Sequence, residues 1–507
     1  MKIKSLFKNS FFSLLSQLVL LIFGFMSQRA MNLYMGTELV GMNGVISNVI
    51  AMLSVTELGV STAIVYHLYS ALAKHDERAI AALLNLYRKA YYVFAVIIGV
   101  LGLIITPFVH LFMKCDSYSL SYVRTLYLLW LIKTVISYPL SYKKSLLIAD
   151  QNEYVVSVIT IFANVIGYSA IVLFVTFTGE YLPALVTGII GDTVLNIWVS
   201  RYVDKKYPFL PGMRDQKPEE ELIRQIINDL KNVFVSRLSL NLLNSTDNLI
   251  ISTFINVSTV GLFNNYGLIT RSVSNIIGAL AASIQPGIGN MFVEKDYDKN
   301  CRVLRQMTFG FFLIVSAAAC GLYVLIDPFV GDIWLESSFK LDRAAVILAV
   351  TSCILQGIGQ PIAVVMGVSG LFNRERTLSI MTALVNLVVS LALVIPFGTA
   401  GVLVGTCLSY LIQIVYRIYI FFKEYVKKDM SRYVYDMLQY VVMCVAEVWI
   451  TSKLVQLVYN RTIISFLLSA LICIVASVGI NLVVFHKSER VSSVTQFASS
   501  IIKKKKG

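Results

Sequence analysis

Polar and ionisable residues recur at helical spacing inside segments of this sequence that are otherwise apolar. In the apolar stretch from 232 to 255, spacings of four, three and four residues place one set on a single helix face: Arg237, Asn241, Asn244 and Asn248. Asp247 adjoins this stripe. The next apolar stretch carries a second stripe, formed by Asn264, Arg271 and Asn275. These two stripes predict two neighbouring helices with one polar face each.

The first half of the chain carries comparable stripes. One runs through Gln17, Gln28 and Asn32 and has Arg29 beside it. Another consists of Asn43, Ser47, Ser54 and Glu57, and Lys133 is a further cation inside an apolar stretch. Hydrogen bonding between helices explains the Asn and Ser residues about as well as a ligand site does. The cations favour a functional site more strongly, because Glu57, Asp192, Asp247 and Glu447 do not obviously match them.

A charge in the hydrocarbon layer costs on the order of 3 kcal/mol or more and normally faces a cavity. Arginine in such a cavity suits a phosphate-bearing substrate, since the guanidinium fork binds phosphate oxygens bidentately and stays charged. Asp247 either neutralises Arg237 or Arg271, or binds a coupling cation (Na⁺ or H⁺) together with Asn386. The sequence predicts no other cofactor.

The sequence contains little that indicates an enzyme. The chain has four His and seven Cys, and their spacing matches neither a metal site nor a disulfide framework. A phosphate-binding glycine loop of the Gly-Lys-Ser or Gly-Lys-Thr type is also missing from the sequence. We find no nucleophile with an evident base, so the sequence predicts a protein that is not an enzyme.

A duplicated pattern organises the chain. The segment Gly36-Thr37-Glu38-Leu39-Val40-Gly41 resembles Asn256-Val257-Ser258-Thr259-Val260-Gly261, which lies 220 residues later. Ile105-Thr106-Pro107-Phe108-Val109 likewise resembles Ile326-Asp327-Pro328-Phe329-Val330. Pro139 and Pro361 occupy equivalent places and are candidate hinges, because each removes a backbone hydrogen bond. Duplicated membrane units usually hold their substrate site between the copies.

Composition indicates a polytopic membrane protein. The 507 residues are 57% hydrophobic and 14% charged, with a mean hydropathy of +0.73. Apolar stretches of roughly 20 residues, the length that crosses a bilayer, recur about fourteen times. The first two lie near 10–33 and 41–71, and the eleventh and twelfth near 377–396 and 399–421. The fold class is therefore expected to be all-α, with two six-helix lobes and two C-terminal helices.

Basic residues assign the orientation. Most of the 43 Lys and Arg fall in segments on one side of the expected membrane, which by the positive-inside rule is the cytoplasmic side. The other side holds only Lys114, Arg124, Lys340, Arg343 and Arg461. This asymmetry explains the net charge of +14 without a nucleic-acid partner. It also predicts that both termini are cytoplasmic.

The chain is expected to divide into five parts. They are an N-terminal lobe (1–203), a cytoplasmic connector with a short amphipathic helix (204–231), a C-terminal lobe (232–425), two additional helices (426–486) and a basic tail (487–507). The tail ends in Lys503 to Lys506 after apolar residues at helical spacing, which suits a helix on anionic membrane lipids. A disordered tail is the alternative.

This organisation resembles the polysaccharide repeat-unit flippases of the multidrug/oligosaccharidyl-lipid/polysaccharide exporter superfamily. The resemblance covers roughly residues 5 to 486. It is most evident from Arg29 to Gly36, from Glu57 to Ala63, and from Ser236 to Asn264. It implies a V-shaped pair of lobes that opens a central cavity to each face alternately, with Arg29, Arg237 and Arg271 meeting a diphosphate. The matching sodium site is incomplete, because helix eleven has no second acid to accompany Asp247 and Asn386.

The expected function is movement of an undecaprenyl-diphosphate-linked oligosaccharide, a capsule, exopolysaccharide or O-antigen unit, to the outer leaflet of the bacterial cytoplasmic membrane. Polysaccharide polymerase and glycosyltransferases are expected partners. Three alternatives stay open. They are a flippase for a peptidoglycan precursor or teichuronic-type lipid, a cation-coupled multidrug exporter, and a membrane scaffold for a polysaccharide synthase that transports nothing.

Overall fold

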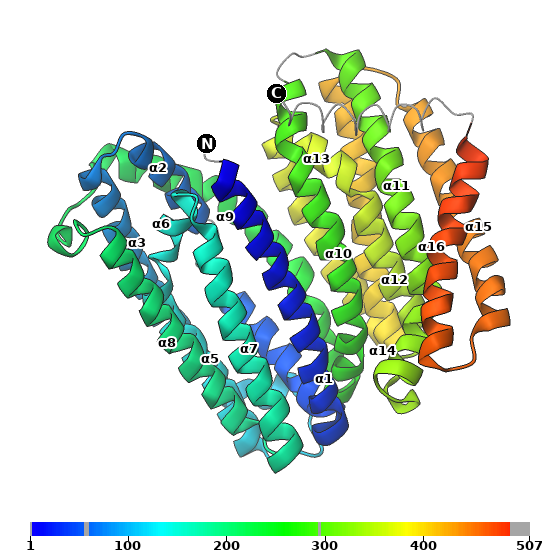
Figure 1. Ribbon diagram of the computed structural model, residues 1–507, viewed down its shortest axis with the longest axis horizontal. Helices are drawn as coiled ribbons and strands as arrows, with labels where there is room; N and C mark the ends of the chain where they lie inside the picture. Colours follow the sequence, from blue (N-terminus) through cyan, green and yellow to red (C-terminus); the bar gives the residue numbers. More distant parts are fainter. Residues whose placement is uncertain (1–2, 55–59, 293–295, 487–507) are drawn as a thin grey trace. The chain divides into compact units, whose positions relative to one another are not determined.

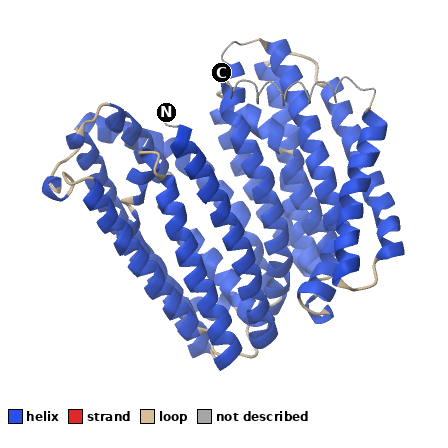
Figure 2. Cartoon of the chain, in the orientation of Figure 1, coloured by secondary structure: helices blue, strands red, loops and turns tan. Residues whose placement is uncertain are grey.

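The structure, a computed structural model, describes residues 3–54, 60–292 and 296–486, and in this part of the chain it is built from helices joined by short loops (Figures 1 and 2). The main helices are α1 (Ile3–Leu53), α2 (Val60–Ala73), α3 (Glu77–Ile105), α4 (Val109–Phe112), α5 (Leu120–Ser141), α6 (Lys144–Ala149), α7 (Glu153–Thr178), α8 (Leu182–Lys206), α9 (Glu220–Phe254), α10 (Val257–Phe292), α11 (Tyr297–Pro328), α12 (Arg343–Ile358), α13 (Gln360–Val368), α14 (Phe372–Ile420), α15 (Ser431–Val458) and α16 (Ile463–Phe485).

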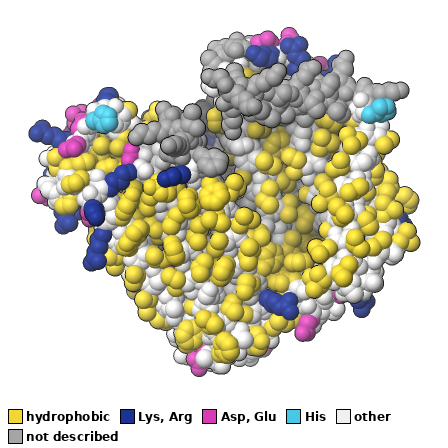
Figure 3. Space-filling view, viewed as in Figure 1, with side chains coloured by type: hydrophobic (Ala, Val, Ile, Leu, Met, Phe, Trp, Pro, Cys, Tyr) yellow, Lys and Arg dark blue, Asp and Glu magenta, His cyan; other side chains and the backbone are white. Residues whose placement is uncertain are grey.

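The helices have the length and composition of membrane spans. Among the described residues, 10 helical segments are long and apolar enough to cross a membrane. On the face seen in Figure 3, hydrophobic side chains make up most of the surface that is drawn in colour, and charged side chains are few among them. The prediction of an all-α membrane protein that crosses the bilayer many times is confirmed. The predicted number of about fourteen crossings stays a prediction.

The chain forms two compact units, Met1–Gly261 and Leu262–Gly507. Within the first unit, α1 packs on α7 and α9, α7 packs on α8, and α3 packs on α5. Within the second unit, α11 packs on α12, α15 and α16, and α12 packs on α14. The expected lobe, connector and tail boundaries stay predictions.

Two long helices turn back on themselves at a glycine. In α1 the turn is at Gly36 (φ 80°), and in α14 it is at Gly398 (φ 58°), a left-handed conformation that glycine adopts without a steric penalty. The side-chain amide nitrogen of Asn43 lies 4.0 Å from the Met31 sulfur, so the legs of α1 run side by side. Each hairpin matches a pair of apolar segments that the sequence predicts, the first with the second and the eleventh with the twelfth.

The duplicated motif makes a reciprocal contact. A Cβ on Gly41 would lie 1.9 Å from the carbonyl oxygen of Val257, and a Cβ on Gly261 would lie 2.0 Å from that of Thr37. Thr37 and Val257 are equivalent in the two copies, as are Gly41 and Gly261. The two copies therefore cross backbone to backbone in a symmetric way at glycines, all inside the first unit. This contact supports the duplication inferred from the sequence.

Two local features differ from or refine the sequence expectation. The amphipathic segment that begins after Pro218 does not end as a separate short helix, because α9 continues from Glu220 to Phe254. No Gly or Pro interrupts this stretch, so nothing in the backbone chemistry stops the helix.

Pro139 lies three residues before the break between α5 and α6, and Pro361 lies in the first turn of α13, directly after the break from α12. Both prolines mark helix breaks, and their role as hinges stays a prediction.

Candidate functional site

A polar cavity lies inside the first unit, among α5, α6, α7 and α8. Its volume is about 320 Å³. Ten of the residues that line it carry polar groups: Trp130, Lys133, Thr134, Ser137, Lys144, Thr160, Asn164, Asp192, Thr193 and Asn196. Such a concentration of polar groups within apolar helices is costly unless the groups bind each other, water or a ligand.

Lys133 is paired inside this cavity. Its ammonium nitrogen lies 3.0 Å from Oδ2 of Asp192, and the two side chains are 33% and 28% exposed. The same nitrogen lies 5.4 Å from the centroid of the Trp130 ring, within the range of a cation–π contact. The sequence offered no obvious anion for this lysine, and the structure supplies one from α8, 59 residues further along the chain.

Asn43 holds one wall of the cavity in place. Its side-chain oxygen accepts hydrogen bonds from the Trp130 indole N–H at 2.9 Å and from the Tyr181 hydroxyl at 3.0 Å. Its amide nitrogen donates to the carbonyl of Leu39 at 3.0 Å. Asn43 thus joins the second leg of α1 to α5 and to the start of α8. This arrangement fits the interhelical hydrogen-bonding interpretation of the stripe.

Other members of the stripes also bond to backbone. Asn32 is 1% exposed and donates to the carbonyl of Gln28 at 2.8 Å. Asn241 donates to the carbonyl of Ala51 at 2.8 Å and accepts from the Ser245 hydroxyl at 2.9 Å, which ties α9 to α1. Asn264 is buried on α10.

The structure does not describe the side chains of three predicted site residues. Glu57 falls in the gap between α1 and α2. For Arg237 and Asn244 the helical backbone of α9 is described, but their side chains are not. Their place in a substrate site stays a prediction.

Two of the predicted arginines are exposed on long apolar helices. Arg29 lies on the first leg of α1 and Arg271 on α10. The Arg271 guanidinium folds back over Gly267, one turn earlier, where a Cβ would lie 2.9 Å from Nη1. A glycine at this position therefore leaves room for the guanidinium against the helix.

The predicted cation-coupling pair belongs to two different units. Asn386 is fully buried within the α14 hairpin and donates to the Thr406 hydroxyl at 3.0 Å. Ser390 and Ser409 make similar bonds between the two legs. Asp247 is half-buried on α9. No cluster of three or more His, Cys, Asp or Glu able to hold a metal occurs among the described residues. Joint cation binding by Asp247 and Asn386 stays a prediction.

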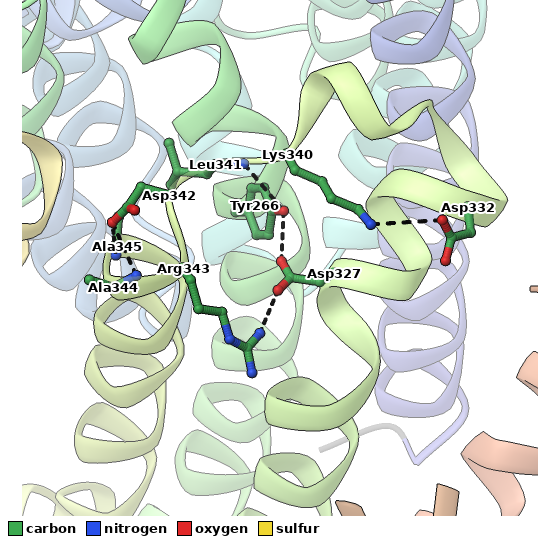
Figure 4. A network of polar contacts seen from close by, with 9 residues as sticks. All are labelled: Tyr266, Asp327, Asp332, Lys340, Leu341, Asp342, Arg343, Ala344 and Ala345. Atoms are coloured by element: carbon green, nitrogen blue, oxygen red, sulfur yellow. Dashed lines mark hydrogen bonds and ion pairs between the residues drawn. The ribbon is translucent and has the colours of Figure 1, made fainter. Parts of the chain in front are cut away.

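A charged network at one end of the second unit was not anticipated (Figure 4). Asp327 accepts a hydrogen bond from the Tyr266 hydroxyl at 2.8 Å and is also paired with Arg343. The network thus joins α10, α11 and α12. Its signal in the sequence is the acid at Asp327, where the first copy of the motif has Thr106.

A neighbouring ionic contact joins α15 to the same end of the unit. Lys340 lies 3.7 Å from Oδ1 of Asp332, and the Tyr459 hydroxyl donates to Oδ2 at 2.9 Å. Burial, and then the hydrogen bond to the Asp332 carboxylate, raise the pKa of Tyr459 to about 12. The phenol therefore stays protonated and keeps donating at physiological pH.

A second unanticipated cluster joins α15 and α16 to α11. Glu447 is fully buried, and its Oε2 accepts a hydrogen bond from the Ser477 hydroxyl at 2.6 Å. Ser477 lies 3.2 Å from the Ser316 hydroxyl, which Asn481 also contacts. The sequence signal is a small or polar residue at every fourth position of α16: Ser465, Ser469, Cys473, Ser477 and Asn481.

Comparisons with solved structures identify the fold. The inward-facing conformation of a multidrug resistance MATE family transporter matches with a TM-score of 0.68 and 14% identity, over 79% of this chain and 93% of that chain. The inward closed conformation of the lipid II flippase MurJ matches with a TM-score of 0.67 and 16% identity, over 94% of this chain and 99% of that chain. The predicted MATE-like fold is confirmed.

Sequence relatives identify the family. The chain is 25% identical over 207 residues to the probable low-salt glycan biosynthesis flippase Agl15 of Haloferax volcanii, a match that spans 39% of this chain and 42% of that relative. The names of these relatives describe flippases and transporters, in agreement with the prediction that the chain is not an enzyme. The pattern of the family described as "Polysaccharide biosynthesis protein" matches residues 6–292. With more than half of its length matched, the chain belongs to this family of polysaccharide biosynthesis proteins.

Proposed function

We propose that this protein is a flippase for an undecaprenyl-diphosphate-linked oligosaccharide, which it moves from the cytoplasmic to the outer leaflet by alternating access. The cargo would be a capsule, exopolysaccharide or O-antigen repeat unit. The cytoplasmic membrane of a bacterium, with both termini on the cytoplasmic side, would be its location. A polymerase and glycosyltransferases would be its partners in the pathway.

The observation that carries the proposal is the exposure of Arg29 and Arg271 on helices otherwise suited to lipid. Arginine exposed to hydrocarbon would cost several kcal/mol, so each guanidinium is expected to face an aqueous path. A guanidinium there binds the diphosphate through paired hydrogen bonds and keeps its charge when water is expelled. Arg237 and Lys133 are the other predicted cations.

Transport of such a lipid separates into two physical tasks. The lipid tail can stay in the bilayer, whereas the diphosphate and the sugars need a polar route. Lobes that open alternately would supply this route without ever forming a continuous pore. Na⁺ or H⁺ coupling through Asp247 and Asn386 would add a driving force, and consumption of the product outside is the alternative source.

Two observations favour a lipid-linked glycan over a drug as cargo. The pattern of the polysaccharide biosynthesis family covers residues 6–292, which include Arg29, Arg237 and Arg271. The fold of the lipid flippase accounts for 94% of the chain, whereas that of the multidrug transporter accounts for 79%. A peptidoglycan precursor differs from the proposed cargo only in its sugars and is a named outcome of the test.

The test compares arginine variants in cells that lack the native protein. Arg29→Ala, Arg237→Ala and Arg271→Ala are each expected to abolish surface polysaccharide while the protein stays in the membrane. Arg271→Lys should restore export only in part, because an ammonium cannot form the bidentate pair. Arg201→Ala, an exposed arginine in the C-terminal part of α8, is the control and should export normally.

Retention of polysaccharide in all three alanine variants would refute the role of the arginines. If the variants lose cell-wall synthesis and keep surface polysaccharide, the protein is a peptidoglycan-precursor flippase. Unchanged polysaccharide with altered resistance to cationic drugs would identify a drug exporter. Failure of a synthase complex to assemble, with each protein otherwise stable, would identify a scaffold.

A further inference from the structure

The polar cavity of the first unit contains more positive than negative charge. Of the described residues that line it, two are lysines, Lys133 and Lys144, and one is an acid, Asp192. Asp192 forms its ion pair with Lys133 at 3.0 Å, and no described residue forms an ion pair with Lys144. One ammonium group is therefore left in excess, and an anion in the cavity would offset it.

The cavity also holds polar atoms that no described residue satisfies. The side-chain oxygen of Asn196 and the side-chain nitrogen of Asn164 are buried and have no hydrogen-bond partner in the described part of the chain. Asn196 is only 8% exposed. One orphan group is an acceptor and the other a donor, and buried polar groups of this kind normally bond to water or to a ligand.

The size and lining of the cavity narrow the ligand class. A volume of about 320 Å³ would hold roughly ten water molecules at ~30 Å³ each, or one sugar ring. The hydroxyls of Thr134, Thr160 and Thr193 donate to backbone carbonyls of their own helices, so their oxygens are left to accept hydrogen bonds. The orphan amide nitrogen of Asn164 donates, so the wall can both donate and accept. Sugar hydroxyls need both, whereas phosphate at neutral pH mainly accepts.

We propose that this cavity is a subsite for an acidic sugar, a monosaccharide residue that carries a carboxylate. In this assignment Lys144 binds the carboxylate, and Asn164 and Asn196 bind ring hydroxyls. Lys133 and Asp192 keep the wall charged and ordered. The inference rests on the proposed function and deepens it, because it names an acidic residue as part of the transported glycan.

The test measures binding of small sugars to the full-length protein in lipid nanodiscs. Calorimetric titrations with sodium glucuronate, glucose and inorganic phosphate would be compared for the wild type, Lys144→Met and Asn196→Ala. Lys205→Met is the matched control, since Lys205 is an exposed lysine at the end of α8 that does not line the cavity.

The wild type should prefer glucuronate to glucose by about tenfold, the effect of one charge-assisted hydrogen bond. Lys144→Met should abolish this preference, and Asn196→Ala should weaken the binding of both sugars. Lys205→Met should bind them like the wild type. Phosphate binding as tight as glucuronate binding would overturn the assignment to a sugar. No binding of any probe, or an unchanged preference in Lys144→Met, would also overturn it.

The outcome is separable from that of the proposed function. If Arg271→Ala abolishes surface polysaccharide while the wild-type protein binds no glucuronate, the flippase function is supported and the acidic-sugar subsite is refuted. If glucuronate binds as expected but the arginine variants export polysaccharide normally, the subsite is supported and the role of the arginines in transport is refuted.

Discussion

At the scale of single residues, the polar groups fall into two kinds. Asn43 and Asn241 have partners on neighbouring helices and hold them together. Arg29 and Arg271 are exposed on long apolar helices, where a merely structural role would be expensive. Lys133 lies between these kinds, because it is paired with Asp192 yet lines a cavity. Exposure and position thus separate residues that the sequence presents as one class.

The Lys133–Asp192 pair gives a stability prediction. Asp192→Asn removes the carboxylate partner of Lys133, and we expect a lower melting temperature corresponding to about 1–3 kcal/mol, between the values for exposed and buried pairs. Thermal unfolding of the purified protein in detergent measures this. The double variant Lys133→Met with Asp192→Leu leaves no unpaired charge and should be more stable than Asp192→Asn. A double variant no more stable than Asp192→Asn would show that the two side chains do not stabilise each other.

At the scale of elements, the repeated motif forms a contact that depends on glycine. Gly41 and Gly261 allow the backbones of equivalent segments to meet, each against a carbonyl oxygen of the other copy. Close approach of this kind permits Cα–H···O contacts in addition to van der Waals packing. The contact is therefore expected to be rigid and sensitive to any added side-chain atom.

Gly261→Ala should disrupt this contact. Its Cβ would lie 2.0 Å from a backbone oxygen, so the segments must separate, and we expect destabilisation by about 1–3 kcal/mol or more. Gly278→Ala in the same helix is the control, because no atom lies within 4 Å of its Cβ. Helix propensity alone should make that control neutral or slightly stabilising. Equal melting temperatures for the two variants would contradict the account.

The periodicity of the sequence predicted where the helices lie. It did not predict which side chains from different helices contact each other. The apolar stretches and the turns at Gly36 and Gly398 follow from hydropathy and glycine chemistry, which are local properties. The pairing of Lys133 with Asp192 depends on how α5 and α8 pack, and no local pattern encodes it. The Asp327 network has the same origin, since its members come from three helices.

At the scale of the whole molecule, charge asymmetry is the feature that predicts the orientation in the membrane. Lys and Arg concentrate in the segments assigned to the cytoplasm, and few lie on the opposite side. The two additional helices continue this alternation, with Lys427 before α15 and Arg461 between α15 and α16. An odd number of crossings before the C-terminus would break the pattern.

Reporter fusions test this orientation. A green fluorescent protein fused after Gly507 should fluoresce, because it folds in the cytoplasm. Alkaline phosphatase fused after Asn460 should be active and the same enzyme fused after Lys427 inactive, because it needs the oxidising outer compartment. The reverse pattern of phosphatase activity would contradict the predicted topology.

Mass spectrometry of lipids extracted from a strain that lacks this protein shows directly whether it moves lipid-linked oligosaccharides. If the protein is the proposed flippase, complete undecaprenyl-diphosphate-linked oligosaccharides accumulate in this strain, and the wild-type gene reverses the accumulation whereas Arg237→Ala does not. Lipid intermediates at normal levels in the deletion strain would contradict the claim that this protein moves them across the membrane.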